Sequence, residues 1–298
     1  MPKRPLNNSQ LLERFRVTDG EGFKLKSIDP DDTAPLDHLA GDDAKDLLKD
    51  GIERLAELQE MLYAQDQRAL LLVFQAMDAA GKDGTIKHVL SGVNPQGCHV
   101  TSFKAPSTEE LDHDFLWRTT KALPQRGVIG IFNRSYYEEV LVVRVHPEFL
   151  DKQRLPDEPK GKQLWEQRYE DINAYERHLT RNGTTILKFF LHVSKKEQKK
   201  RFLERLDTPE KNWKFSSADV AEREHWDEYM EAYEDVIRET STPDAPWYVV
   251  PADNKWFTRL VVSAAINAEL ESLGLHFPVV DPARLAELER CRRELRGN

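Results

Sequence analysis

The feature that most constrains the fold of this chain is a nearly unbroken apolar run, Ala-Leu-Leu-Leu-Val-Phe-Gln-Ala, from Ala69 to Ala76. A strand that is buried on both faces has this pattern, because neither face carries polar side chains. Strands of this kind occur mainly in parallel sheets that helices cover on both sides. The run therefore predicts the centre of a parallel sheet in an α/β fold.

Other segments extend this pattern along the chain. Strands are predicted at Ala69–Ala76, His99–Phe103, Val128–Phe132, Thr185–Val193 and Trp247–Val250. Helical spacing is found at Asp42–Gln65, Thr85–Ser91, Thr108–Ala122, Ser135–Val143, Lys162–Arg181, Lys195–Leu206, Asp219–Glu239, Asn254–Leu273 and Pro282–Arg296. Strands that alternate with helices predict a three-layer α/β/α sandwich with a mainly parallel five-stranded sheet. Such sheets bind ligands at the carboxyl ends of their strands.

The sequence divides into three parts. Residues 1–41 predict a mostly irregular N-terminal leader, residues 42–280 one α/β domain, and residues 281–298 a charged C-terminal helix. No internal repeat or low-complexity tract interrupts this order. A chain of 298 residues with 39% hydrophobic residues is long enough to bury one large core.

Composition excludes several classes of protein. A mean hydropathy of -0.65 and the lack of a long apolar run argue against a membrane protein. The net charge of -9 argues against a general nucleic-acid binder, although a local basic patch can still hold a polyanion. Two distant cysteines and an N-terminus without an apolar stretch predict a cytoplasmic protein. The histidines show no spacing typical of a zinc site.

The segment after the first strand, Ala76–Ile86, has the context of a phosphate-binding loop. A Gly-Lys turn joins a strand to a helix, so backbone N–H groups can face an anion while Lys82 reaches its phosphates. The usual G-x-x-x-x-G-K-[ST] pattern is not met, since Ala76 and Asp83 replace its first Gly and its Ser/Thr. The alternative interpretation is a strand–helix turn that Gly81 and Gly84 merely cap and pack.

Two acidic or amide positions predict a metal ion near this loop. A carboxylate beside a polyphosphate repels it unless a cation lies between them, so Asp78 indicates a Mg²⁺ ligand. Asn133 stands at the end of the third strand, where related nucleotide-binding folds hold metal with an acidic residue. Asn133 can offer a carbonyl oxygen to the metal, or it can cap a helix. Arg134 follows it and is expected to contact an anion.

Several motifs taken together resemble the polyphosphate kinase type 2 family. They are Met77–Gly84, Ser91–Gly97, Phe132–Tyr137, Arg168–Asn173, Lys188–His192, Arg201–Leu206, Trp213–Ser216, Trp226–Tyr229 and Ala245–Asp253. The resemblance spans roughly Leu47 to Leu273, most of the chain. It implies a P-loop kinase-like fold with a helical lid at about 195–218, and Mg²⁺-dependent transfer of phosphate between inorganic polyphosphate and nucleotides.

The resemblance also implies roles for individual residues. The catalytic set is Asp78, Lys82, Asn133, Arg134 and Glu138, with metal at Asp78 and Asn133. The loop context and the basic segment described next predict the phosphate-binding set, which is Ala79, Ala80, Gly81, Lys82, Asp83, Gly84, Thr85, Arg201, Arg205, Lys211 and Lys214. The Asn-Arg pair followed by Glu138 resembles the branch that accepts nucleoside monophosphates as well as diphosphates. Asn133 departs from family members with Asp there, which leaves open whether it binds metal directly.

A basic segment supports a long anionic substrate. Residues 195–214 contain eight basic and four acidic side chains in a chain that is acidic overall. Arg201 and Arg205 are four residues apart and share a helix face, so both are expected to hold polyphosphate. Lys211 and Lys214 are expected to contribute, while a solvated helix face is the simpler alternative. The expected partners are inorganic polyphosphate, adenine and guanine nucleotides, and further copies of the chain. Binding to nucleic acid or to a membrane is not expected.

Two other functions compete with polyphosphate-dependent transfer. The first is an ATP-dependent P-loop kinase that phosphorylates a nucleotide or a small metabolite. The second is a protein that binds nucleotide or polyphosphate without turnover. No nucleophile motif is found, which favours direct in-line transfer without a covalent enzyme intermediate.

Overall fold

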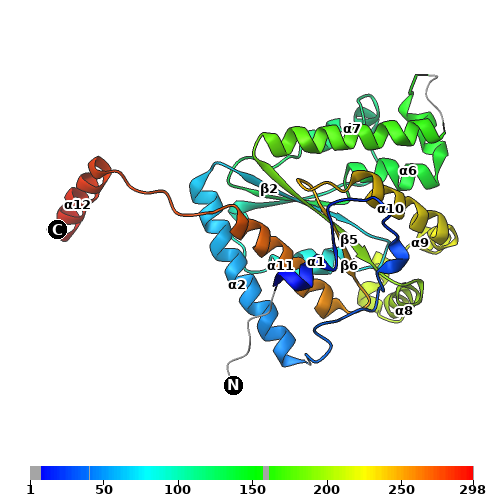
Figure 1. Ribbon diagram of the computed structural model, residues 1–298, viewed down its shortest axis with the longest axis horizontal. Coiled ribbons are helices and arrows are strands. Elements are labelled where there is room, and N and C mark those ends of the chain that lie inside the picture. Colours follow the sequence, from blue (N-terminus) through cyan, green and yellow to red (C-terminus); the bar gives the residue numbers. More distant parts are fainter. Residues whose placement is uncertain (1–7, 40, 157–160, 298) are drawn as a thin grey trace.

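A six-stranded sheet forms the centre of the computed structural model, which describes residues 8–39, 41–156 and 161–297 (Figure 1). The strands are β1 (Arg16–Val17), β2 (Ala69–Gln75), β3 (Cys98–Ser102), β4 (Ile129–Asn133), β5 (Thr184–His192) and β6 (Trp247–Pro251). Their order across the sheet is β1-β6-β5-β2-β4-β3. Every residue of β2 is buried, as its apolar run predicts.

Five of these strands are parallel, and the sixth is an addition that the sequence analysis missed. β2 pairs in parallel with β4 and β5, β3 with β4, and β5 with β6. The two-residue β1 pairs antiparallel with β6 through Arg16 and Val17. A strand this short has no recognisable alternation of side chains, so the prediction of five strands was wrong by one edge strand.

Helices cover both faces of the sheet and confirm the three-layer sandwich. The α-helices are α1 (Asn8–Glu13), α2 (Asp42–Gln65), α3 (Lys82–Val89), α4 (Thr108–Leu111), α5 (Trp117–Thr120), α6 (Val142–Val145), α7 (Lys162–Arg181), α8 (Lys195–Leu206), α9 (Ser217–Glu222), α10 (Trp226–Thr240), α11 (Lys255–Ser272) and α12 (Pro282–Arg296). Shorter 3-10 turns are η1 (Leu25–Ser27), η2 (Pro95–Gly97), η3 (Tyr136–Val140), η4 (Pro147–Gln153), η5 (Pro209–Lys214) and η6 (Arg223–His225). α2, α3 and α11 pack together on one face, and α6, α7 and α10 on the other (Figure 1).

The described part of residues 1–41 contains short regular elements within the mostly irregular leader that the sequence predicts. These elements are α1, β1 and η1. The side chains of Leu11, Phe15, Leu25 and Leu36 are buried in the common core. Its helix and strand are only six and two residues long, so their patterns are too short to read from sequence.

The C-terminal helix α12 projects from the body of the molecule (Figure 1). None of its residues is buried. Among the described residues, none of the helices is both long enough and apolar enough to cross a membrane.

Candidate active site

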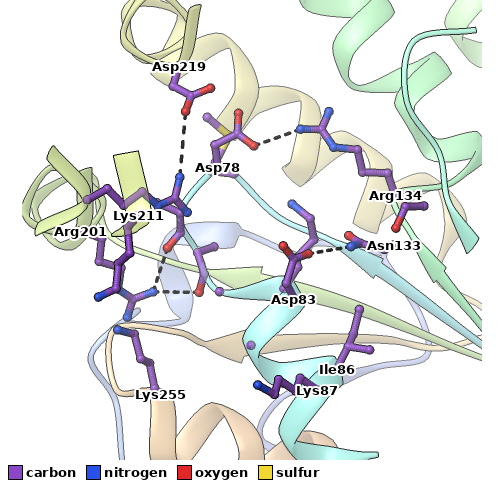
Figure 2. A pocket seen from close by; sticks show the side chains of 18 of the residues that line it. Asp78, Asp83, Ile86, Lys87, Asn133, Arg134, Arg201, Lys211, Asp219 and Lys255 are labelled. Carbon is purple, nitrogen blue, oxygen red and sulfur yellow. Dashed lines mark hydrogen bonds and ion pairs between the residues drawn. The ribbon is translucent and has the colours of Figure 1, made fainter. Parts of the chain in front are cut away.

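A cleft of about 950 Å³ opens at the carboxyl ends of the parallel strands. Its walls come from the loop after β2, the ends of β3 and β4, helix α8, and the segment that follows α8 (Figure 2). The lining includes Asp78, Ala79, Ala80, Gly81, Lys82, Asp83, Gly84, Asn133, Arg134, Arg201, Arg205 and Lys211. The sheet therefore brings together most of the residues expected to act on phosphate.

The loop from Ala76 to Gly81 has a backbone shaped for an anion. Ala79 and Gly81 both adopt positive φ angles, of 62° and 106°, and α3 begins directly after Gly81 at Lys82. Positive φ is costly for alanine, so the surrounding contacts must hold Ala79 in place. Gly81, Lys82 and Asp83 at the N-terminus of α3 line the cleft, and a helix N-terminus favours negative charge.

Lys82 is mostly buried at the start of α3, and its Nζ donates to the carbonyl oxygen of Ala76 at 2.9 Å. Burial lowers the pKa of Lys82, and the positive charge of Arg134 lowers it further. A bound phosphate would offset both effects, because it adds negative charge beside the ammonium group.

Arg134 links the loop after β2 to the loop after β4. Its Nη2 donates to Asp78 Oδ1 at 3.0 Å (Figure 2). Its Nη1 donates to Glu138 Oε2, also at 3.0 Å. Gln75 donates to the other Glu138 oxygen at 2.8 Å. The negative charge of Glu138 is the main cause of the raised pKa of Arg134. Glu138 itself does not line the cleft, so it acts on the cleft through Arg134.

Asn133 ends β4 and does not cap a helix. Its Nδ2 donates to Asp83 Oδ1 at 2.7 Å, which leaves the amide oxygen as the group able to meet a cation (Figure 2). The cap of the following η3 is Ser135, whose hydroxyl accepts from the N–H of Tyr137. The capping alternative for Asn133 is therefore wrong. Thr85 is buried and does not line the cleft.

A buried charge pair supports the loop after β4 from behind. Lys188 Nζ, fully buried in β5, lies 2.6 Å from Glu176 Oε2 of α7. The hydroxyl groups of Tyr136 and Tyr137 each donate to Glu176 Oε1 at 2.8 Å. Tyr136 and Tyr137, two and three residues after Arg134, are thereby fixed to the core, and they hold the strand-end loop in place.

The last turn of α8 and the segment after it carry further charges into the cleft. Arg205 Nη1 lies 4.0 Å from Asp219 Oδ2 of α9. Burial raises the pKa of Asp219, and the nearby charge of Asp78 raises it further. Lys211 in η5 lines the cleft and is exposed. The side chain of Lys214 lies outside the described residues.

Arg201 occupies a different position from the one expected. Only 5% of the residue is exposed, and its guanidinium group donates to the carbonyl oxygens of Ala79, Ala80, Ala252 and Asp253 at 2.7–3.1 Å. Its Nε donates to Glu197 at 3.0 Å. Arg201 touches the cleft wall, yet its donors are directed at the protein.

Sequence reasoning missed several charged residues that line the cleft, namely Lys87, Lys104, Asp219 and Lys255. Lys104 and Lys255 follow the ends of β3 and β6, which reach the same edge of the sheet as β2. That position was a usable signal for both residues. No such signal marked Asp219, because an acidic side chain close to a basic segment is usually interpreted as a surface ion-pair partner.

Comparisons with known proteins agree with this geometry. The family model described as "Polyphosphate kinase 2 (PPK2)" matches residues 38–276. An ADP-polyphosphate phosphotransferase of Rhodopseudomonas palustris is 56% identical over 284 residues, covering 95% of this chain and 98% of the relative. An AMP/ADP-polyphosphate phosphotransferase of Meiothermus ruber is 48% identical over 274 residues, covering 91% and 97%.

A solved structure extends the agreement to the fold. The crystal structure of polyphosphate kinase 2 from Arthrobacter aurescens has a TM-score of 0.85 and 43% sequence identity to this chain. The match covers 96% of each chain. Because the family model covers well over half of the chain and two relatives align over nearly their full lengths, this chain belongs to the polyphosphate kinase 2 family and is an enzyme of that family.

Proposed function

We propose that this enzyme transfers the terminal phosphate between inorganic polyphosphate and both AMP and ADP, with Mg²⁺ and by direct in-line displacement. The observation that carries the proposal is the meeting of three features in one cleft. These are the phosphate-binding loop with Lys82, the Asp78–Arg134 ion pair that Glu138 supports from outside the cleft, and the cations in the last turn of α8 and after it. Positioning and charge stabilisation are the main requirements of phosphoryl transfer.

Lys82 and Arg134 supply positive charge where negative charge develops in the transition state. Lys82 lies at the N-terminus of α3, and Arg134 reaches the same cleft from β4. Glu138 holds the Arg134 side chain, with Gln75 fixing Glu138 in turn. Neither residue has to form a covalent intermediate, since fixed positive charges alone lower the barrier to phosphate transfer.

The oxygen atoms on the cleft wall fit Mg²⁺. Asp78, Asp83 and Asn133 offer carboxylate and amide oxygens, the hard ligands this ion takes. Among the described residues there is no cluster of three His, Cys, Asp or Glu able to enclose a metal. Mg²⁺ commonly uses one or two protein carboxylates together with substrate phosphates, so Asp78 with Asn133 or Asp83 would hold it. The ion would neutralise charge between the phosphates.

Cations at the rim of the cleft support a long anionic substrate. Arg205, Lys211, Lys87, Lys104 and Lys255 all line it. A nucleotide alone is largely satisfied by the loop and Arg134, whereas a polyphosphate chain presents repeated charges that need several cations. Arg205 and Lys211 are proposed as polyphosphate contacts, and Lys214 remains a proposal from sequence.

The choice of acceptor rests on Asn133 and on the relatives. The Rhodopseudomonas relative is named for ADP, and the Meiothermus relative for both AMP and ADP. Use of AMP is proposed here because this chain carries Asn133 before Arg134 and Glu138 after it. Guanine nucleotides, a homo-oligomeric state and a cytoplasmic location are also proposed, and they can be tested by acceptor assays, light scattering and fractionation.

The deciding assay supplies polyphosphate as the sole phosphate donor with AMP, ADP, GMP or GDP as acceptor, at several Mg²⁺ concentrations. Formation of the next higher phosphate is expected with AMP and ADP, and the proposed use of guanine nucleotides predicts it with GMP and GDP as well. Transfer only from ATP to an acceptor would support the ATP-dependent kinase instead. Binding of polyphosphate and nucleotide without product would support the non-catalytic alternative.

Replacing Lys82 tests the phosphate-binding loop. Lys82→Ala should lower kcat by two or more orders of magnitude, because a contact of this kind contributes about 3–4 kcal/mol to the transition state. Lys87→Ala is the matched control, since Lys87 also lines the cleft but lies in the last turn of the same helix, α3. It should alter KM more than kcat. A Lys82→Ala enzyme with nearly normal kcat would contradict the assignment.

Replacing Asp78 tests the metal ligand. Asp78→Asn keeps the size of the side chain and removes its charge, so turnover should be lost and the response to added Mg²⁺ weakened. Direct titration of Mg²⁺ by calorimetry, with a nucleotide analogue present, measures the metal step apart from turnover. Unchanged Mg²⁺ dependence would mean that Asp78 only shapes the loop with Arg134.

A further inference from the structure

We propose that Arg201 and Gln198 of α8 are positioning residues that hold the carbonyl groups of the phosphate-binding loop away from the bound phosphate. This inference rests on the proposed function and deepens it. It replaces the expectation that Arg201 is a ligand of polyphosphate. The two assignments predict different kinetics, so they can be separated.

The hydrogen bonds of Arg201 account for all five of its donors. Nη1 donates to Ala79 O at 3.1 Å and Ala80 O at 2.8 Å, and Nε donates to Glu197 at 3.0 Å. Nη2 donates to Ala252 O at 2.7 Å and Asp253 O at 2.9 Å. A guanidinium group has five N–H donors, so none is left for a phosphate oxygen. Figure 2 shows Arg201 directed at the loop backbone.

Gln198 continues the same contact one turn earlier on α8. Gln198 is 1% exposed, and its Nε2 donates to the carbonyl oxygen of Asp78 at 2.9 Å. Its Oε1 accepts from Arg223 at 2.6 Å, which fixes the orientation of the amide. The carbonyl groups of three consecutive loop residues, 78 to 80, are therefore held by one face of α8.

Holding these carbonyl groups has a direct electrostatic effect. A carbonyl oxygen that points at a phosphate repels it, whereas an N–H group attracts it. The positive φ of Ala79 is an arrangement that alanine does not favour by itself. Arg201 draws the Ala79 and Ala80 oxygens toward α8 and ties them to the loop after β6 at Ala252 and Asp253. The loop is thereby anchored to the rigid sheet.

The test compares Arg201→Lys with Arg205→Ala and with Lys199→Ala, an exposed cation on the outer face of the same helix. Arg201→Lys keeps the charge but loses the planar fork, so loop order is lost without loss of local charge. We expect kcat to fall about 100-fold, the cost of misplacing reacting groups by about 1 Å. KM for polyphosphate should stay near the wild-type value. Arg205→Ala should instead raise that KM, and Lys199→Ala should change neither constant.

Amide hydrogen exchange of residues 76–84 provides a readout that does not depend on turnover. Arg201→Lys and Gln198→Met should both exchange faster there than the wild type, while Lys199→Ala should not. If Arg201→Lys fails to fold, Gln198→Met carries the same prediction for exchange and kcat. Normal exchange with a raised, salt-sensitive KM for polyphosphate would overturn the proposal and make Arg201 a ligand. If the wild-type enzyme showed no polyphosphate-dependent transfer, the proposed function would be refuted. The hydrogen-exchange result would still test whether Arg201 and Gln198 order the loop.

Discussion

At the scale of single residues, neighbouring charges decide what each group in the cleft can do. Arg134 bridges Asp78 and Glu138, and its charge also reaches Lys82. Asn133 is turned by Asp83 so that its amide oxygen is the atom available to a cation. Glu138 stands four residues after Arg134, so that pair could be read from the spacing. Asp78 and Asp83 come from another loop, so no spacing in the sequence shows that they meet Arg134 and Asn133.

The pair of Lys82 and Arg134 predicts a specific pH dependence. Because burial and the charge of Arg134 lower the pKa of Lys82, kcat/KM should fall on the alkaline side below the ordinary lysine value of 10.5. Arg134→Met removes the repelling charge, so this alkaline limb should move to higher pH even though the rate falls. Arg134→Lys keeps the charge and is the control. If the alkaline limb of the kcat/KM profile stayed at the same pH in Arg134→Met, the effect of the Arg134 charge on the pKa of Lys82 would be contradicted.

At the scale of elements, the N-terminal segment belongs to the core. The Phe15 carbonyl oxygen accepts from the N–H of Val249 at 2.8 Å, and the Phe15 ring packs edge-on against Phe257 at 5.8 Å between centroids. Asp31 and Pro30 contact Asn254 and Asp253 by hydrogen bonds. The same loop after β6 receives Arg201, so this segment supports the surroundings of the phosphate-binding loop.

Truncating Phe15 tests this role. Phe15→Ala should lower the free energy of unfolding by about 3–5 kcal/mol, the usual cost of removing a buried phenyl group. Leu295→Ala is the control, because Leu295 is also apolar but is 79% exposed on α12. Urea denaturation followed by tryptophan fluorescence measures both. Equal, small losses in the two variants would show that the segment does not pack as described.

At the scale of the whole molecule, the parallel sheet decides which parts of the chain can act together. The ends of β2, β3, β4 and β6 lie along one edge, so loops separated by well over a hundred residues form one cleft. The neighbouring end of β5 carries His192, which is buried. Burial lowers the pKa of His192 from 6.5 to about 4, against a smaller opposing effect of Asp29.

His192 makes the stability of the molecule depend on pH. Between pH 6.5 and about pH 4 the unfolded chain binds a proton that the folded chain does not, so the free energy of unfolding falls as the pH falls. The full change corresponds to about 3 kcal/mol. Above pH 6.5 His192 adds no pH dependence to the free energy of unfolding, because it is neutral in both states. Denaturation of His192→Gln at pH 7 and pH 4.5 should show a smaller difference than the wild type. An equal difference would assign the acid sensitivity to other groups.

The sequence by itself determined the fold class and the position of the candidate phosphate-binding loop. The apolar run of β2 requires burial on both faces, and a Gly-Lys turn between such a strand and a helix requires no tertiary information to interpret. Trp226, Tyr229 and Tyr233 stand at helical spacing in α10, and all three are buried, as is usual for an apolar stripe with this period.

Only the tertiary structure decided the role of Arg201 and the extent of the cleft. An arginine on a helix can bind a polyanion or bind backbone carbonyl groups. The local sequence does not distinguish these two roles, since both need an arginine at the same position. Which of the two Arg201 meets depends on two loops that are distant in the sequence. The loop after β2 contacts Arg201 at separations of 121 and 122 residues, and the loop after β6 at 51 and 52 residues. Helical periodicity is a local property, whereas a hydrogen-bond partner is fixed only when the sheet brings distant strand ends together.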